Sequence, residues 1–338
     1  MNFREKLQLA YQKIRASNKI LLVSHLSPDA DALASIGAMI EVLKKENKSW
    51  FAFAKGKPTG VYKFINNEQL ISATAPKSLL DFDLIIILDC GSIARTGLEP
   101  EIRELLTLRA ARIKKKPYLI EFDHHQQQES YADLEIREPK KAATTEIIYH
   151  FLLANQLEIT KPLANCILIG LMTDTGHFLH ANASREALAI ASEMLLFGAS
   201  LPKIINKTVH NKSFSSLKLW GKVLERMKYN DQTGLLIVGL SQADLRQIFS
   251  PQEQSAKADL FGDIISFLSY LSGVQVALML REEEGWVRGN LRTTSDQIDV
   301  AKIAAWWGGG GHQKAAGFAL KGKLKEVTEG WTVLRQED

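Results

Sequence analysis

Short apolar runs and longer amphipathic stretches alternate along the N-terminal half of the chain. The short runs are made of consecutive apolar residues, as buried strands are, whereas the longer stretches carry apolar residues every three or four positions, as helices do. Strands that alternate with helices predict an α/β domain with a doubly wound, mainly parallel sheet. The expected strands cover residues 19–24, 49–54, 84–88 and 117–122, and the expected helices cover 3–17, 31–46, 99–112, 143–155 and 161–173.

The C-terminal part has a different pattern, in which helices come first and strands follow. Because 338 residues exceed what one typical core holds, we predict two domains. The first covers 1–195, a helical interdomain connection covers 196–215, and 216–338 form a smaller α/β domain with a mixed sheet. Residues 183–228 are expected to be mostly helical, followed by strands at 234–240, 274–280 and 286–292 and helices at 241–249, 257–271 and 299–305.

Composition and charge narrow the class of protein. With 46% hydrophobic and 24% charged residues, the chain resembles ordinary globular proteins rather than disordered ones. Its net charge of +4 is only mildly basic, which disfavours a protein that tracks long duplex DNA and favours short anionic substrates. We expect no membrane span, no signal peptide and no disulfide from Cys90 and Cys166, and therefore a cytoplasmic location.

Acidic and imidazole side chains follow four of the apolar segments. The segment SHLSPDADALAS comes directly after the first predicted strand, and similar polar residues follow the runs 84–88, 118–122 and 167–173. Ligand sites of open α/β sheets lie at the carboxyl ends of their strands, so we expect these side chains to meet at one edge. They are His25, Asp29, Asp31, Asp89, Asp123, His124, His125 and Asp174.

These residue types predict a metal centre. Carboxylates and imidazoles without thiolates suit Mn²⁺ or Mg²⁺ better than structural zinc. Six of these side chains are enough to bind two ions, with Asp89 as a bridge between them. Two ions about 3.5–4 Å apart can bind both the attacking hydroxide and the leaving oxygen when a phosphate ester is hydrolysed. Taken singly, Asp29 and Asp31 also fit turn or N-cap roles, Asp89 a strand-end turn and Asp174 a helix end. The six are His25, Asp29, Asp31, Asp89, His124 and Asp174.

A glycine-rich segment near the C-terminus is the second chemical signal. Residues 308–311 are all glycine, so the backbone amides there could approach an anion closely, and His312 and Lys314 add donors. The segment lacks the Lys-Ser/Thr ending of a nucleotide P-loop, and a simple turn between a helix and a strand is the alternative. Arg292, at the end of a predicted strand, is a candidate phosphate fork. We expect Trp306 and Trp307 to be packing residues rather than base platforms.

In order along the chain, SHLSPDADALAS, LDCGS, FDHH, LMTDTGHF and GGGGHQKAAGF resemble the DHH phosphoesterase superfamily with its DHH-associated C-terminal domain. The resemblance is greatest to the oligoribonuclease and pAp phosphatase (nanoRNase) branch. It implies that His25, Asp29 and Asp89 hold one Mn²⁺, and that Asp31, Asp89, His124 and Asp174 hold the other, with Mg²⁺ as a substitute.

The resemblance also implies roles around the ions. Asp123 would orient ligands and His125 would contact the scissile phosphate. The stretch 142–146, AATTE, matches the family without a clear role. Two residues depart from the usual pattern, namely Ala30, where many members have Gly, and His177, where this branch often has Arg. In the C-terminal domain, the residues implied to grip a terminal phosphate or nucleotide are Arg292, Gly309, Gly310, Gly311 and His312.

The resemblance therefore predicts a Mn²⁺-dependent phosphoesterase that hydrolyses short single-stranded RNA or DNA oligonucleotides to mononucleotides, with pAp as a further substrate converted to AMP. Long duplexes and membranes are not expected partners. A homodimer fits the sequence, although no residue requires one. Two alternatives stay open at this point. One is a phosphodiesterase for linear or cyclic dinucleotides such as pApA, pGpG or c-di-AMP, and the other is a catalytically silent nucleotide-binding regulator.

Overall fold

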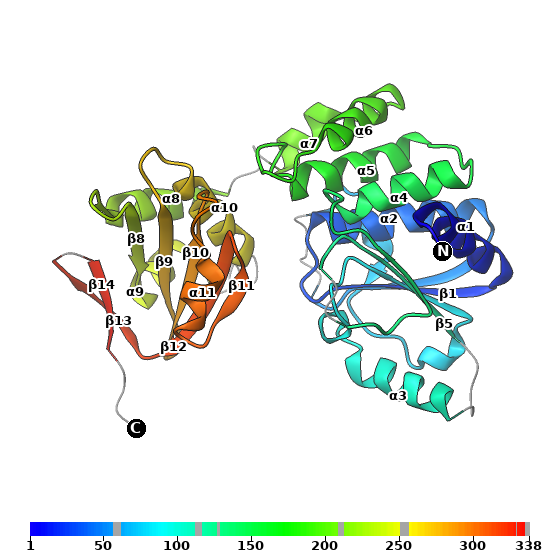
Figure 1. Cartoon of the computed structure of the whole chain (residues 1–338), viewed down its shortest axis with the longest axis horizontal. Helices are drawn as coiled ribbons and strands as arrows, with labels where there is room; N and C mark the ends of the chain where they lie inside the picture. The colour runs from blue at the N-terminus through cyan, green and yellow to red at the C-terminus, as the bar shows by residue number, and fades with distance from the viewer. Residues whose placement is uncertain are drawn as a thin grey trace. The chain divides into compact units, whose positions relative to one another are not determined.

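The chain folds into two compact units, Met1–Asn211 and Lys212–Asp338 (Figure 1). The computed structural model describes residues 1–56, 62–111, 117–126, 129–208, 213–250, 257–328 and 330–334. The division falls inside the predicted connection 196–215, of which residues 209–212 lie outside the described part. Helix α7 (Leu201–Thr208), which that connection contains, packs with the first unit, because Ile204 is buried in the core of that unit.

The first unit is built on a six-stranded sheet with the order β3-β2-β1-β4-β5-β6. Every neighbouring pair of these strands is parallel, which confirms the predicted doubly wound fold. The chain leaves β1 toward one edge and returns to build the other edge from β4, so the topological switch point lies between β1 and β4. The strands are β1 (Lys19–Ser24), β2 (Ser49–Phe53), β3 (Ile71–Ser72), β4 (Leu84–Leu88), β5 (Tyr118–Asp123) and β6 (Leu134–Arg137).

Helices cover both faces of this sheet (Figure 1). Alternate residues of each strand point to opposite faces, so Leu22 and Ile86 enter one core and Leu21 and Ile85 the other. The first core packs against α1 (Phe3–Ala16), α2 (Ala30–Lys45), α4 (Thr144–Ala154) and α5 (Lys161–Asp174), and the second packs against α3 (Glu99–Ala110). Helix α6 (Arg185–Leu196) packs on α5, and 3₁₀ turns occur at Glu68–Leu70, Leu79–Asp81 and Ile93–Thr96.

The second unit has a six-stranded sheet with the order β11-β12-β10-β9-β8-β7. Only β8 and β9 pair in parallel among these described strands, and the other pairs are antiparallel, as the predicted mixed sheet requires. The strands are β7 (Lys228–Asn230), β8 (Leu235–Leu240), β9 (Val276–Glu283), β10 (Trp286–Arg292), β11 (Gly310–His312) and β12 (Ala315–Lys321).

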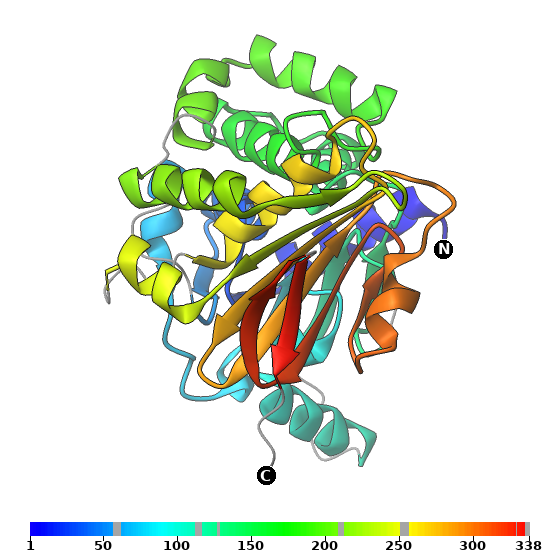
Figure 2. The same ribbon diagram turned by 90° about the vertical axis from the view of Figure 1, so that its left-hand side faces the viewer.

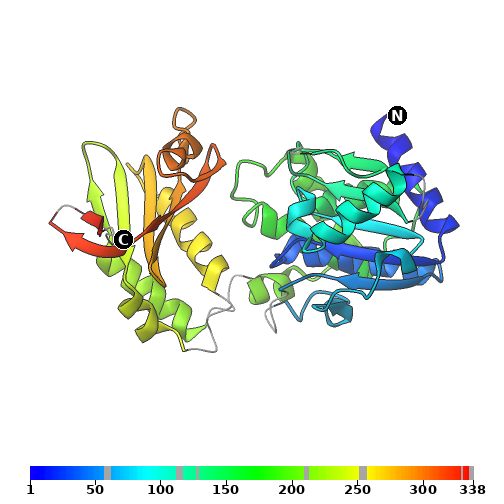
Figure 3. The same cartoon turned by 90° about the horizontal axis from the view of Figure 1, so that it is seen from below.

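The two faces of the second sheet carry different elements. Helices α8 (Phe214–Arg226), α9 (Gln242–Ile248) and α10 (Lys257–Ser269) pack on the face that carries Val238 and Met279. Helix α11 (Val300–Ala305) and the hairpin of β13 (Lys323–Val327) and β14 (Gly330–Leu334) pack on the face that carries Leu291. Figure 2 shows this hairpin in red in front of the sheet, and Figure 3 shows it on the side opposite α10.

The two tryptophans before the glycine segment differ in how they pack. Trp307 packs on Phe318 with ring centroids 4.6 Å apart, as expected, but Trp306 is 77% exposed, so the packing prediction is wrong for Trp306.

Within the described ranges, no single helix is long and apolar enough to cross a bilayer. The pair α6 and α7 reaches that length and apolar composition only when both helices are taken together, and it is bent by 117°.

Candidate metal centre

The strand ends at the switch point bring the first site residues together. His25 directly follows β1, Asp89 directly follows β4, and Asp123 is the last residue of β5. Asp89 adopts a left-handed backbone conformation with φ +59°, a conformation that costs a non-glycine residue energy and that is concentrated at functional sites. The chain therefore keeps Asp89 turned back toward the site at the expense of local strain.

The first ligand group consists of His25, Asp29 and Asp89. His25 Nε2 lies 3.7 Å from Asp29 Oδ2 and 3.8 Å from Asp89 Oδ2. His25 Nδ1 lies 2.9 Å from the carbonyl of Leu26, so Nδ1 carries the proton and Nε2 keeps a free lone pair. That Nε2 atom is buried without a hydrogen-bond partner in the described part of the chain. Asp29 is also the N-cap of α2 and accepts from the amide of Ala32 at 3.0 Å, so the N-cap alternative holds together with its place in the group.

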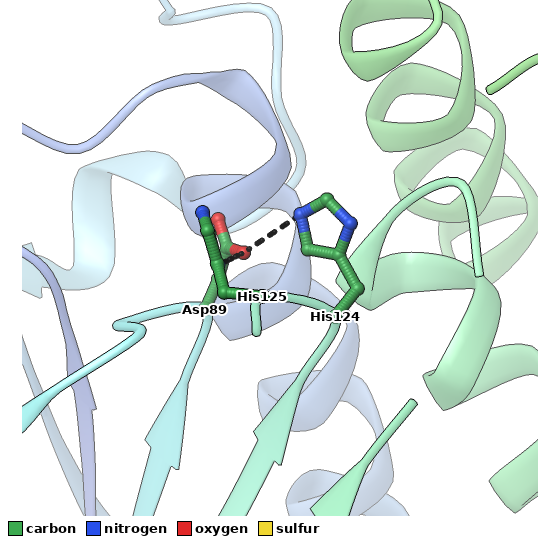
Figure 4. Close-up of side chains that lie close together, drawn as sticks. All are labelled: Asp89, His124 and His125. Atoms are coloured by element: carbon green, nitrogen blue, oxygen red, sulfur yellow. Dashed lines mark ion pairs between the residues drawn. The ribbon is translucent and has the colours of Figure 1, made fainter. Parts of the chain in front are cut away.

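The second ligand group consists of Asp31, His124 and Asp174, and it lies next to the first. His124 Nε2 is 3.1 Å from Asp174 Oδ2 and 3.5 Å from Asp89 Oδ1. Figure 4 shows Asp89 beside His124 and His125 at the ends of their strands. Asp89 Oδ2 faces His25 within the first group, and Asp89 Oδ1 faces His124 of the second. Asp89, His124 and His125 also form a third group, so the structure brings all six predicted ligands into neighbouring groups with Asp89 between them.

Asp123 is fully buried and organises the neighbouring loop. Its Oδ1 accepts from both the backbone amide and the ring Nδ1 of His125, each at 2.8 Å, and its Oδ2 accepts from the amide of Gly91. A carboxylate can only accept, so Nδ1 of His125 carries the proton and its Nε2 is available to a ligand. Asp123 thus fixes the ring of His125, and its role in orienting the predicted metal ligands stays a prediction.

A buried ion pair that the sequence analysis missed supports this loop. The guanidinium of Arg137 pairs with Glu121 and donates to the carbonyls of Gly91 and Gln126 at 3.2 Å. Burial raises the pKa of Glu121 to about 7, and Tyr131 donates its hydroxyl proton to the same carboxylate. Arg137 therefore ties the loop after β4 to the loop after β5, which are the loops that carry Asp89 and His125.

The pKa values show how much negative charge is concentrated here. Burial raises the pKa of Asp89 well above its ordinary value, and the charges of Asp31 and Asp29 add to the rise. Burial and Asp31 raise the pKa of Asp174 to about 7. Burial lowers the pKa of His124, but its hydrogen bond to Asp174 and the charges of Asp174, Asp31 and Asp123 together outweigh burial and bring this pKa to about 9. Carboxylates crowded in this way are stabilised by a bound cation.

The AATTE stretch, whose role the sequence left open, forms the start of α4 and touches the site. Thr144 and Thr145, both fully buried, donate hydrogen bonds to Asp31 and Asp89. Gly170 of α5 makes room for these contacts, because a Cβ there would lie 2.1 Å from both Asp31 Oδ1 and Thr145 Oγ1.

A further cluster of Glu146, His150 and Glu186 has metal-like spacing but already holds a cation. Lys141 Nζ lies 3.2 Å from Glu146 Oε1, 2.9 Å from His150 Nε2 and 2.7 Å from Glu186 Oε2. The carbonyl of Lys141 lies 3.3 Å from His124 Nδ1, which leaves Nε2 of His124 to face the ligand group. This cluster therefore supports His124 and is not a second metal centre.

In the second unit, the predicted anchor residues share one face of the sheet. Arg292 of β10 is opposite Ala315 of β12, which is opposite His312 of β11, and directly opposed residues of antiparallel strands point to the same side. Burial lowers the pKa of Arg292, whose guanidinium donates a hydrogen bond to the carbonyl of Leu291 at 3.0 Å. No described carboxylate pairs with this guanidinium, so it is available to an anion.

The glycine segment differs from the predicted loop. Gly308, with φ +71°, lies in the turn that follows α11. The amide of Gly309 donates back to the carbonyl of Ala304 in that helix, so it is not free for an anion. Gly310 and Gly311 belong to edge strand β11, which pairs with small residues of β12 and leaves other backbone groups unpaired at the sheet edge. Lys314 is also not free, because its Nζ bonds Asp296 at 2.7 Å.

His177, which stands where the oligoribonuclease and pAp phosphatase branch often has Arg, is held within the first unit. His177 has φ +60°, and its Nε2 lies 2.8 Å from the hydroxyl of Thr208 in α7. Its ring is therefore engaged with α7, and it does not reproduce a free phosphate-binding arginine.

Two family profiles match the chain, the DHH family, N-terminal domain, over residues 19–171 and the DHHA1 domain over residues 245–330. The probable bifunctional oligoribonuclease and PAP phosphatase NrnA of Streptococcus mutans is 30% identical over 313 residues, which are 90% of each chain. The chain belongs to the DHH family. It is accordingly an enzyme, a hydrolase of the phosphoesterase type, and its DHH profile includes most of the first unit's sheet.

Further comparisons agree with this family. The bifunctional oligoribonuclease and PAP phosphatase NrnA of Thermus thermophilus is 28% identical over 94% of this chain and 89% of that protein. An exopolyphosphatase-related protein from Bacteroides fragilis has the same fold, with a TM-score of 0.79 and 23% identity over 93% of this chain and 90% of that one. The exonuclease RecJ, solved bound to manganese, has a TM-score of 0.51 and 14% identity over 95% and 90% of the two chains.

Proposed function

We propose that this DHH enzyme is a two-ion phosphoesterase that hydrolyses short oligonucleotides, dinucleotides included, to mononucleotides, and that it also converts pAp to AMP. The observation that carries the proposal is the convergence of six side chains into two neighbouring groups, with Asp89 in the first and 3.5 Å from His124 of the second. The names of the NrnA relatives, oligoribonuclease and PAP phosphatase, support this substrate class.

The residues present fit divalent ions. The two groups contain only carboxylates and imidazoles, and the buried, unpartnered Nε2 of His25 is a ligand atom without another role in the described chain. We expect His25, Asp29 and Asp89 to hold one Mn²⁺ and Asp31, Asp89, His124 and Asp174 to hold the other, with Mg²⁺ as a substitute. When bound, such ions lower the pKa of a coordinated water and polarise a phosphoryl oxygen.

The chain's own residues bind and orient the phosphate. His125 presents Nε2 to the scissile phosphate, because Asp123 accepts the Nδ1 proton and so fixes the orientation of the ring. Arg292 and His312, with the free edge of β11 at Gly310 and Gly311, offer donors to a second phosphate of the substrate. An enzyme that binds two phosphates favours pAp and pApA, which carry a terminal phosphate, over ApA, which lacks one.

The test is a hydrolysis assay with Mn²⁺ that compares pAp, pApA, ApA, c-di-AMP and a long single strand, with products separated by length. We expect AMP from pAp and pApA, slower cleavage of ApA, and little cleavage of the long strand. Preferred cleavage of c-di-AMP would support the cyclic dinucleotide alternative, and absence of turnover with every substrate would refute the proposed substrate class. Asp89→Asn serves as the inactive control.

A further inference from the structure

Helix α4 begins directly against the two ligand groups. The first amides of a helix have no partner within the helix, and its N-terminus favours a negative charge. In α4 these amides are used inside the protein, because Thr144 N donates to Asp31 Oδ2 at 2.7 Å and Thr145 N donates to Asp31 Oδ1 at 3.2 Å. The start of α4 therefore fixes the carboxylate of Asp31.

The hydroxyl of Thr144 reaches the other group. It donates to Asp89 Oδ1 at 2.8 Å. The terminal torsion of an aspartate is broad, so the Asp89 carboxylate could otherwise rotate about its last bond. With this hydrogen bond in place, Oδ1 faces His124 at 3.5 Å while Oδ2 faces His25 at 3.8 Å. Thr144 thus fixes the plane in which Asp89 can serve both groups.

The neighbouring threonine determines which oxygen of Asp31 stays available. Thr145 Oγ1 donates to Asp31 Oδ1 at 2.7 Å, in addition to the Thr145 amide. Two donors occupy the lone pairs of Oδ1, whereas Oδ2 accepts only from the amide of Thr144 among the described groups and keeps a lone pair. Asp31 therefore presents Oδ2 to a cation.

We propose that Thr144 is a positioning residue for both ions, since its amide holds Asp31 of one group and its hydroxyl holds the shared Asp89. This inference rests on the proposed two-ion function. Groups that orient metal ligands typically change metal affinity about 10- to 100-fold when they are removed. The same loss is expected here for the ion that depends on the orientation of Asp89.

The test is a calorimetric titration of Mn²⁺ into the metal-free full chain. Thr144→Val keeps the shape of the side chain and removes the hydroxyl, whereas Thr144→Ser keeps the hydroxyl. We expect two ions in the wild type and in Thr144→Ser, and a loss of about tenfold or more in the affinity of at least one ion in Thr144→Val. Thr96→Val is the matched control, because Thr96 is equally buried and its hydroxyl bonds only backbone groups, the carbonyl of Ile93 and the amide of Leu98.

The outcomes separate this inference from the proposed function. Wild-type affinities at both positions in Thr144→Val would overturn the role of Thr144 while leaving the two-ion enzyme intact. Fewer than two ions in the wild type would overturn the proposed function itself. If Thr144→Val does not fold by circular dichroism, Thr144→Ala and Thr144→Ser give the same comparison, since both lack the methyl group and only the second keeps the hydroxyl. Equal affinities in that pair would also refute the inference.

Discussion

Two helical glycines offer a direct test of the packing behind the metal centre. Gly170 lies in α5 and Gly221 in α8. Replacing a helical glycine by alanine normally stabilises a helix by about 1 kcal/mol. A Cβ at Gly221 would meet nothing within 4 Å, whereas a Cβ at Gly170 would lie 2.1 Å from Asp31 Oδ1 and from Thr145 Oγ1. The same substitution should therefore have opposite effects at the two positions.

The magnitude follows from the contacts that Gly170→Ala would break. Overpacking of a core costs about 1–3 kcal/mol, and a displaced Thr145 would leave Asp31 short of a donor at a cost of about 1–3 kcal/mol. After the gain in helix propensity, we expect a net loss on the order of 1–5 kcal/mol. For a unit of this size that loss lowers the Tm by about 2–20 °C. Activity should fall as well, because Asp31 moves.

The assay combines thermal unfolding of the metal-free chain with the rate of pApA hydrolysis in Mn²⁺. Gly221→Ala should unfold at the same or a higher temperature and keep wild-type activity. A Gly170→Ala protein with raised Tm and unchanged rate would refute the packing argument, because it would mean that Asp31 and Thr145 tolerate the added methyl group.

Four further predictions concern charge. Asp89→Asn should lower kcat by roughly a thousandfold, because bound ions supply several kcal/mol of transition-state stabilisation and Asp89 faces both groups. A rate within tenfold of wild type would contradict its bridging role. Metal ligands must lose their protons before they bind an ion. The apparent Mn²⁺ affinity should therefore rise with pH through the pKa of Asp174, about 7, and that of His124, about 9. A calorimetric Mn²⁺ affinity that does not change between pH 6 and 9 would contradict this. In the metal-free chain the sign for His124 is opposite: its raised pKa stabilises the fold at low pH, and this stability is lost as the pH rises toward 9, as unfolding measurements can show. Arg292→Met should raise KM for pApA about 10- to 100-fold relative to ApA, since a charge-assisted hydrogen bond contributes about 1.5–3 kcal/mol. Arg288→Met, at an exposed position four residues earlier on the same strand, should leave this ratio unchanged.

The sequence was most informative where one local rule applies. Strand β4 covers Leu84–Leu88 as predicted, because strands buried on both faces consist of continuous apolar residues. The site residues follow such strands or end the helix α5, so their order along the chain already indicated a shared edge. Strand β6, with its alternating Leu134–Arg137, and the glycine strand β11 were missed, because their pairing partners rather than their own residues make them strands.

By itself, then, the sequence determined the doubly wound fold, the residue types of the candidate metal centre and the family. Only the tertiary structure decided how these residues are held. Thr144, Lys141 and Arg137 look like ordinary polar residues along the chain, yet each contacts a ligand or a ligand-bearing loop. Hydrogen bonds of this kind join segments that are far apart in sequence. They depend on atomic positions and side-chain orientations, and the order of residue types along the chain does not specify these.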